Sequence, residues 1–290
     1  MTTFFSALLY YLVMKPISLL PHFLLYRLSD FIFLVFYYVI PYRKKVVLDN
    51  LRKSFPEKDE KEIQAICKKF YRHFTDLLLE SLKNFSITRK QVVKRYRSVN
   101  TQLLDRLHNE GKSMILCGGH FANWEFWAVA AAPDFKHPLY ALYSTLSNPY
   151  FDRKMRASRG KYGLNLISTK KYSLFLKDHI HKMQFTSVFA FDQSPSNPSK
   201  AVWVNFLGRD TAAQFGAEKY AKDYNLPVVF GHQYKTARGY YEVHYELVTE
   251  DPNSFDHGAL TQRLYEILEK DIRQNPHLWL WTHRRWKHSR

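Results

Sequence analysis

The chain has 290 residues, of which 46% are hydrophobic and 17% aromatic, too many core-forming side chains for a disordered or collagen-like protein. Its 43 basic and 26 acidic side chains leave a formal charge of +17, which suits nucleic acid, anionic lipid or an acidic protein as partner. Cys67 and Cys117 have no metal-ligand spacing. We therefore expect neither a disulfide framework nor a metal site.

Residues 1–42 are far more apolar than the rest. Lys15, Pro21 and Asp30 are among the residues that divide them into pieces shorter than the roughly 18-residue run of a clean transmembrane span. We expect no secretory signal, because no basic side chain precedes the apolar stretch. Such pieces fit a helical membrane anchor in the interface, followed by basic residues 43–45 that would meet anionic lipid. A buried helical hairpin is the alternative.

Residues 43–290 are predicted to form the catalytic domain, and its first part, 43–111, reads as a helical lead-in. Apolar residues spaced by three and four predict a long amphipathic helix from Asp59 to Phe85, which Asp59 and Glu62 would begin with a capping box. A shorter helix is expected from Thr101 to Glu110, before Gly111.

From residue 112 onward, short apolar runs alternate with helical patterns, which predicts an α/β core with a mixed, largely parallel sheet flanked by helices. The predicted strands are Ser113–Cys117, Leu139–Tyr143, Leu164–Ser168, Thr186–Phe191, Ala201–Phe206, Pro227–Gln233 and Tyr240–Val248. The predicted helices are Trp124–Ala132, Asn148–Tyr162, Tyr172–Met183, Ala212–Asn225 and His257–Gln274, ahead of a tail at 276–290.

The most informative local pattern is Gly118-Gly119-His120-Phe121-Ala122-Asn123-Trp124-Glu125, between a predicted strand and a predicted helix. Strand ends of open α/β sheets are where active sites form. Asn123 is a favoured N-cap, so Glu125 would fall in the first helical turn while His120 stays in the loop. The two side chains can then face each other. A capped helix with an incidental histidine is the alternative.

A histidine oriented by a carboxylate can act as general base toward a hydroxyl. The sequence contains no G-x-S-x-G elbow, no phosphate-binding P-loop and no H-E-x-x-H zinc helix. The residue pair would therefore activate a substrate hydroxyl directly, with Glu125 orienting His120.

The segment His120-Phe121-Ala122-Asn123-Trp124-Glu125 resembles the H-x-x-x-x-[DE] box of the lipid A biosynthesis acyltransferases, the lauroyl and myristoyl transferases of Gram-negative bacteria. Other segments resemble the family in the same order along nearly the whole chain. They are residues 41–51, Ser54-Phe55-Pro56, Arg159 with Gly163, Phe191-Asp192-Gln193, Phe206-Leu207-Gly208 and residues 278–286.

The resemblance implies transfer of a fatty acyl chain from acyl carrier protein to a hydroxyl of a lipid A precursor, an anionic glycolipid, at the cytoplasmic face of the inner membrane. It assigns the catalytic pair to His120 and Glu125 and implies no cofactor. Arg159 or the backbone amides near Gly118 and Gly119 would stabilise the oxyanion.

Four further positions are interpreted as substrate-binding beside the catalytic pair. Arg159 is expected to bind an anionic group, although it could equally be part of a solvated basic helix face. Asp192 and Gln193, after an apolar strand, are expected to organise the site, with a simple turn as the alternative for Asp192. Asn123 is included because of its place in the box.

The tail adds Arg284 and Arg285 to the candidate substrate-binding residues, since four positive charges and no acid lie in the last nine residues. Basic residues among tryptophans can also bind single-stranded nucleic acid. The chain has no recognised nucleic-acid module, so we favour a phosphorylated glycolipid or an anionic membrane surface and expect no nucleic acid.

We therefore interpret the chain as a membrane-associated α/β acyltransferase of lipid A assembly. Two alternatives stay open. One is the same chemistry on another acceptor, such as an amino-lipid, a phospholipid or an aryl-polyene pigment. The other is a non-catalytic membrane-surface protein of the same fold.

Overall fold

The computed structural model describes residues 2–288 and 290. A seven-stranded sheet with the order β1-β9-β8-β2-β5-β3-β4 forms the centre, and strands β6 and β7 form a separate antiparallel pair. Strands β2, β3, β4, β5 and β8 run parallel, whereas β9 is antiparallel to β8. The strands are β1 (Tyr96–Ser98), β2 (Met114–Gly118), β3 (Leu139–Tyr143), β4 (Leu164–Ser168), β5 (Thr186–Ala190), β6 (Ala201–Phe206), β7 (Arg209–Gln214), β8 (Val228–Ala237) and β9 (Tyr240–Thr249).

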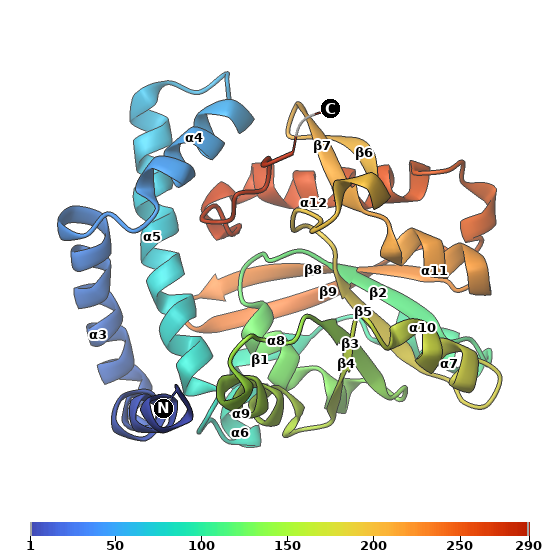
Figure 1. The fold of residues 1–290 in the computed structure, drawn as a ribbon, viewed down its shortest axis with the longest axis horizontal. Helices are drawn as coiled ribbons and strands as arrows, with labels where there is room; N and C mark the ends of the chain where they lie inside the picture. Colours follow the sequence, from blue (N-terminus) through green and yellow to red (C-terminus); the bar gives the residue numbers. More distant parts are fainter. Residues whose placement is uncertain (1, 289) are drawn as a thin grey trace.

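Helices cover both faces of this sheet. Figure 1 shows α12 on one side and α8 and α9 on the other, with the long α5 standing beside the tip of the β8–β9 hairpin. The helices after residue 43 are α4 (Lys44–Ser54), α5 (Glu60–Lys83), α6 (Arg89–Arg95), α7 (Gln102–Asn109), α8 (Trp124–Ala130), α9 (Pro149–Gly160), α10 (Tyr172–His179), α11 (Gly216–Tyr224) and α12 (Ala259–Gln274). The predicted α/β class and mostly parallel sheet are confirmed.

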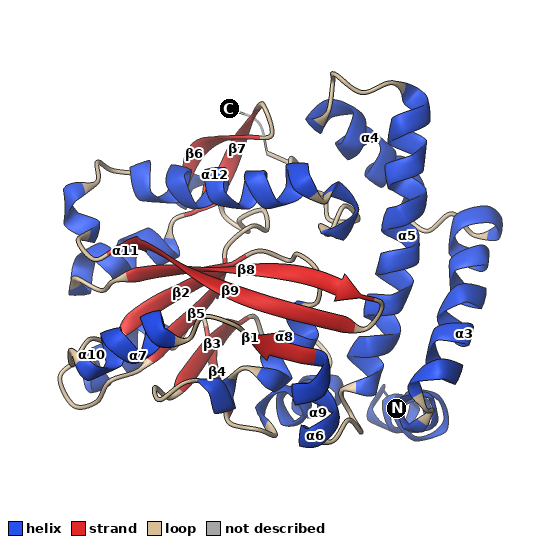
Figure 2. Cartoon of the chain, turned by 180° about the vertical axis from the view of Figure 1, so that it is seen from behind, coloured by secondary structure: helices blue, strands red, loops and turns tan. Residues whose placement is uncertain are grey.

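The N-terminal segment is helical. Its later part lies along α5, on the side away from the sheet, and its first part lies at the foot of α5, near α9 (Figures 1 and 2). It consists of α1 (Thr2–Leu9), a π-helical turn at Tyr10–Met14, α2 (Lys15–Leu19), α3 (His22–Leu34) and a second π-helical turn at Val35–Val39. Only the break before Pro21 separates two helical stretches. Among the described residues, His22–Val39 is one helix of 18 residues with mean hydropathy 1.3, long and apolar enough to cross a membrane.

This helix corrects the expected division at Asp30, because it runs through that charge. Asp30 forms an ion pair with Arg238, in the turn between β8 and β9. The opposite face of the segment is exposed and apolar. Its most exposed members are Phe4, Phe5, Leu12, Leu19, Phe23, Phe31, Val39 and Ile40, each more than 60% exposed.

Two other expectations were wrong in detail. Residues 212–214 do not begin a helix but end β7, where Ala212 pairs with Trp203 of β6. The lead-in is not wholly helical, since β1 adds to the sheet edge beside β9. The capping box at Asp59 and Glu62 is present, and α5 begins where it predicts.

Candidate active site

Strand pairing brings the two main polar side chains of the site together. Strands β2 and β5 are parallel neighbours, with Gly118 paired to Ala190. His120 and Asp192 each follow two residues after this last pair, so they leave the same edge of the sheet at the same level. Neighbouring parallel strands place their carboxyl ends side by side.

Asp192 holds the His120 loop through both carboxylate oxygens. Its Oδ1 lies 2.6 Å from His120 Nδ1, and its Oδ2 accepts the His120 backbone N–H at 2.9 Å. The indole of Trp279 donates a third hydrogen bond to Oδ2 at 2.8 Å. The Asp192 side chain is 2% exposed, so a carboxylate buried this deeply needs these donors.

These contacts define the protonation of the pair. Burial opposes the charge on Asp192, but His120 and the other donors outweigh it and lower the pKa of Asp192 to about 2. Burial likewise lowers the pKa of His120, and Asp192 overcomes that effect and holds the pKa above its ordinary value of 6.5. An ionised Asp192 accepts a hydrogen bond from the Nδ1–H of His120. In the neutral imidazole, the lone pair is then on Nε2, where it can accept a proton from a substrate.

The reactive side of the imidazole faces Gln193 and Trp124. The amide nitrogen of Gln193 lies 3.1 Å from His120 Nε2, and the ring of Trp124 meets the imidazole edge to face at 5.0 Å. The structure thus brings Asp192 and Gln193 to His120.

Glu125 does not orient His120, which corrects the predicted dyad. Its carboxylate instead forms two hydrogen bonds with Arg159 of α9, from Nε at 3.0 Å and from Nη2 at 2.5 Å. The Glu125 side chain is 10% exposed, so this bidentate pair is largely removed from water. Glu125 contributes to the raised pKa of His120 through its charge, after Asp192. The site therefore contains two ion pairs, His120–Asp192 and Glu125–Arg159.

A cavity of about 530 Å³, which we call the large cavity, adjoins both pairs. The residues already described that line it are His120, Trp124, Arg159 and Gln193. Its other walls are mainly apolar and come from the sheet and from α8 and α11. They include Leu116, Ala128, Ala141, Leu142, Leu166, Val188, Phe189 and Ala217. A cavity of this size with mainly apolar walls and some polar groups suits a small-molecule or lipid substrate.

Glycine at position 119 fits the close packing of this loop. A Cβ there would lie 2.7 Å from Leu268 Cδ1 of α12 and 3.4 Å from Asp192 Oδ2.

No group of three or more histidine, cysteine, aspartate or glutamate side chains that could hold a metal occurs in the described part of the chain.

Asn123 and Arg285 have structural places, which corrects their assignment to substrate binding. The Asn123 side chain is fully buried, caps α8 through Phe126 N–H at 2.8 Å, and donates to Glu80 Oε2 at 2.6 Å. Arg285 is 1% exposed and donates to the hydroxyl of Tyr265 at 2.7 Å. Tyr265 in turn donates to the carbonyl of Phe191, the residue before Asp192. Arg285 therefore contacts the site only through Tyr265.

Arg284 is exposed and lies outside the large cavity. Nothing in its surroundings joins it to His120. Trp279, by contrast, was not predicted as a site residue although its segment carried the resemblance. Only the fold shows that its indole reaches Asp192.

The comparison with known proteins agrees with this architecture. The sequence model of the bacterial lipid A biosynthesis acyltransferases matches residues 1–288. The chain belongs to this family. Its members are acyltransferases, and the two ion pairs beside an apolar cavity are the acyltransferase's candidate catalytic site. No match was found among curated proteins.

Proposed function

We propose that this acyltransferase moves a fatty acyl chain from acyl carrier protein to a hydroxyl of a lipid A precursor, with His120 as general base. The observation that carries the proposal is that His120, which is paired with Asp192, lines the large, mainly apolar cavity. The family supports the lipid A precursor as acceptor. The apolar cavity suits the acyl chain, because burial of each methylene is favourable by about 0.8 kcal/mol.

In the proposed reaction, the acceptor hydroxyl displaces the Gln193 amide and donates its proton to His120 Nε2 as its oxygen attacks the thioester carbonyl. A carbon–oxygen bond forms and the carbon–sulfur bond then breaks. The proton held by His120 then passes to the leaving sulfur, so that the carrier departs as a thiol and His120 is neutral again. Asp192 stabilises the imidazolium between these steps.

Arg159 is the proposed donor to the oxyanion. Its Nε and Nη2 are engaged by Glu125, while Nη1 has no hydrogen-bond partner among the described residues, and the side chain lines the same cavity as His120. Glu125 would fix the guanidinium so that this nitrogen is presented to the developing charge without reorganisation.

Mass spectrometry of products from purified protein, acyl carrier protein carrying a fatty acid, and a lipid A precursor tests the proposal. His120→Ala should lower turnover by about 10²–10⁴-fold, whereas His181→Ala, an exposed histidine after α10, should leave it unchanged. Acylation of an amino-lipid or phospholipid in place of the precursor would change the proposed acceptor. Near-normal turnover of His120→Ala would remove the mechanism.

The donor assignment rests on charge. The chain carries +17, and an acidic carrier protein would be steered toward it, an effect that weakens as salt shortens the Debye length to about 10 Å at 0.1 M. The apparent KM for the carrier should therefore rise with ionic strength. Equal activity with acyl-coenzyme A, with no dependence on salt, would contradict the assignment.

We place the protein at the cytoplasmic face of the inner membrane, bound through the exposed apolar face of residues 1–42. The variant Phe23→Ser/Phe31→Ser should shift the protein from membranes toward the soluble fraction, because both rings are exposed and contribute little to packing within the chain. Leu174→Ser/Tyr234→Ser, exposed elsewhere, is the control. Equal partitioning of the two variants would contradict this surface as the anchor.

A further inference from the structure

A second cavity, of about 500 Å³, lies between α3, α5 and the β8–β9 hairpin. We call it the basic cavity. It shares no lining residue with the large cavity. Its cationic side chains come from α5 and from the end of β8 and the following turn. They are Lys69, Arg72, Lys235 and Arg238.

Two cations of the cavity pair with its two acidic side chains. Arg238 forms ion pairs with Asp76 at 2.7 Å and with Asp30 at 2.7 Å, and Lys235 Nζ lies 3.5 Å from Asp76 Oδ2. Lys69 and Arg72 are exposed and have no acidic partner in the part of the chain that the structure describes. The guanidinium of Arg72 lies over the ring of Phe33, 5.2 Å from its centroid. Two cations are thus available for an anion.

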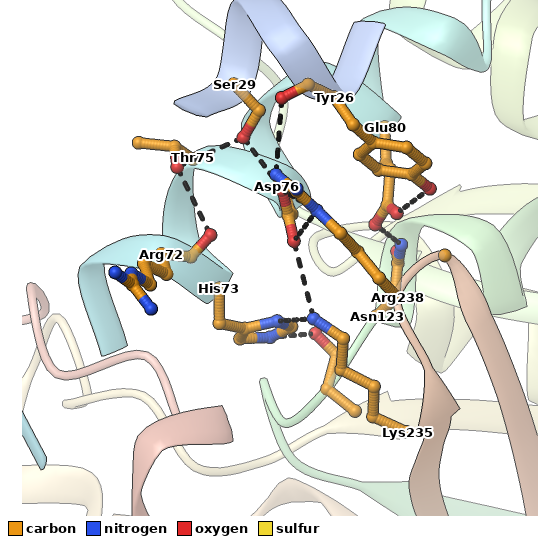
Figure 3. A network of polar contacts seen from close by, with 12 residues as sticks. Tyr26, Ser29, Arg72, His73, Thr75, Asp76, Glu80, Asn123, Lys235 and Arg238 are labelled. Atoms are coloured by element: carbon orange, nitrogen blue, oxygen red, sulfur yellow. Dashed lines mark hydrogen bonds and ion pairs between the residues drawn. The ribbon is translucent and has the colours of Figure 1, made fainter. Parts of the chain in front are cut away.

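Lys235 and His73 connect this cavity to the loop at residues 119–123, which carries His120 and which we call the catalytic loop (Figure 3). His73 Nε2 lies 2.9 Å from the carbonyl oxygen of Ala122, which can only accept, so Nε2 carries the proton. His73 Nδ1 then accepts from the Lys235 ammonium at 3.3 Å. Burial, followed by the charge of Lys235, holds the pKa of His73 well below its ordinary value, in agreement with a neutral ring.

The catalytic loop is tied to the same place from its other side. The Ala122 N–H donates to the Leu278 carbonyl at 3.0 Å, and the preceding residue, His277, lines the basic cavity. Ala122 has φ 49, a left-handed conformation that is rare for alanine. The residue two positions after His120 is therefore held in a strained conformation by contacts that begin at this cavity.

We infer that the basic cavity binds the phosphate group of a phosphorylated lipid, the acceptor of the reaction. Lys69 and Arg72 would provide the first contacts and Lys235 the inner one. The lipid's apolar part would follow α3, whose Phe33 and Leu34 line the cavity and whose outer face is apolar and exposed. Binding from this side leaves the large cavity free for the acyl chain of the donor.

The phosphate chemistry stands on the cavity alone, while the identity of the lipid as acceptor rests on the proposed function. Binding is therefore measured first without any donor. Full-length protein in neutral detergent micelles is titrated by calorimetry with phosphatidic acid, with phosphatidylcholine of the same chains, and with inorganic phosphate. Saturable binding of phosphatidic acid, and at least tenfold weaker binding of the other two, is expected.

Lys69→Gln/Arg72→Gln should weaken phosphatidic acid binding by about tenfold or more, because each substitution removes a charge-assisted hydrogen bond. Lys61→Gln/Lys90→Gln is the matched control, since both lysines are exposed on α5 and α6 and the net charge changes equally. All four positions are exposed, so the variants should fold. Equal weakening by the control would reduce the effect to general attraction. Equal binding of phosphatidylcholine would exclude phosphate recognition.

Inorganic phosphate that binds as tightly as phosphatidic acid would identify the cavity as a site for a free anion and overturn the lipid. In the transfer assay, Lys69→Gln/Arg72→Gln should raise the apparent KM for a phosphorylated acceptor by the same factor and leave kcat unchanged. If the wild-type protein transfers no acyl chain, the proposed function fails while the binding titration still tests the cavity. An unchanged KM alongside weakened binding would show that the bound lipid is not the acceptor.

Discussion

The imidazole of His120 and the carboxylate of Asp192 lie 2.6 Å apart although 72 positions separate them in the chain. They meet because β5 inserts between β2 and β3 in the sheet. The chain forms β3 and β4 before it forms β5, which pairs with β2. The geometry of the candidate base therefore depends on a crossover, and any change that shifts the β2–β5 register would separate the pair.

Replacement of Asp192 should change both the rate and its pH dependence. Because Asp192 raises the pKa of His120, Asp192→Asn should lower that pKa and move the acidic limb of kcat/KM toward lower pH. The maximal rate should fall by about 10²–10⁴-fold, since a carboxamide can accept at one end only and cannot satisfy three donors. Asp178→Asn, exposed on α10, serves as control. An unmoved limb would show that another group titrates in the reaction.

Glu125 and Arg159 should behave as one unit, and His120 as part of another. Glu125→Gln and Arg159→Met should each lower turnover by about 10²–10³-fold, as for loss of an oxyanion donor, and the double variant should be little worse than either. If Glu125 oriented His120, as expected from the sequence, this non-additivity would instead be found for His120 with Glu125. From the observed pairing, His120→Ala and Glu125→Gln should instead give nearly multiplicative losses. A double-variant cycle on single-turnover rates distinguishes these outcomes.

The large cavity should limit the length of the acyl chain. Ala141→Leu adds volume to a wall of the cavity, so the preferred donor should become shorter by a few carbons. Competition among carriers loaded with chains of different length measures the preference. Ala65→Leu, on an exposed position of α5, should leave the preference unchanged. The same chain preference in Ala141→Leu would place the acyl chain elsewhere.

Glu80 should make stability depend on pH. Burial, followed by the charge of Asp76, raises the pKa of Glu80 to about 7 from its ordinary value of 4.5. The folded protein therefore keeps a proton that the unfolded chain releases. Its contribution is fully present below about pH 4.5 and is lost as the pH rises through about 7.

Glu80→Gln should remove this dependence, because it cannot ionise. Relative to that variant, the wild type should lose up to about 3 kcal/mol of unfolding free energy between pH 5 and pH 8. Urea denaturation at both values measures the difference. Glu57→Gln, exposed, should retain the wild-type dependence. Parallel pH profiles for the wild type and Glu80→Gln would show that Glu80 stays ionised.

Local patterns predicted the elements of the α/β core well, because apolar periodicity and caps such as Asp59 act within a few residues. Local patterns and the family resemblance also singled out His120, Asp192 and Gln193, and the structure places these three side chains together. They did not find which carboxylate faces His120, since proximity along the chain favoured Glu125 while strand order favours Asp192. The places of Asn123 and Arg285 could not be predicted, because a polar residue near a candidate site can equally satisfy a buried partner, here Glu80 or Tyr265.

The shell around the Glu80 carboxylate also constrains when the chain can finish folding. Its hydrogen-bond donors are Tyr26 of α3, Asn123 at the start of α8, and Tyr241 of β9. During synthesis at about 5–20 residues per second, Tyr26 emerges many seconds before Tyr241 exists. The apolar N-terminal segment therefore cannot complete its contacts around Glu80 until nearly the whole chain has been made. A nascent chain that reaches the membrane early would bind it through this segment first and would form the loop that carries His120 last.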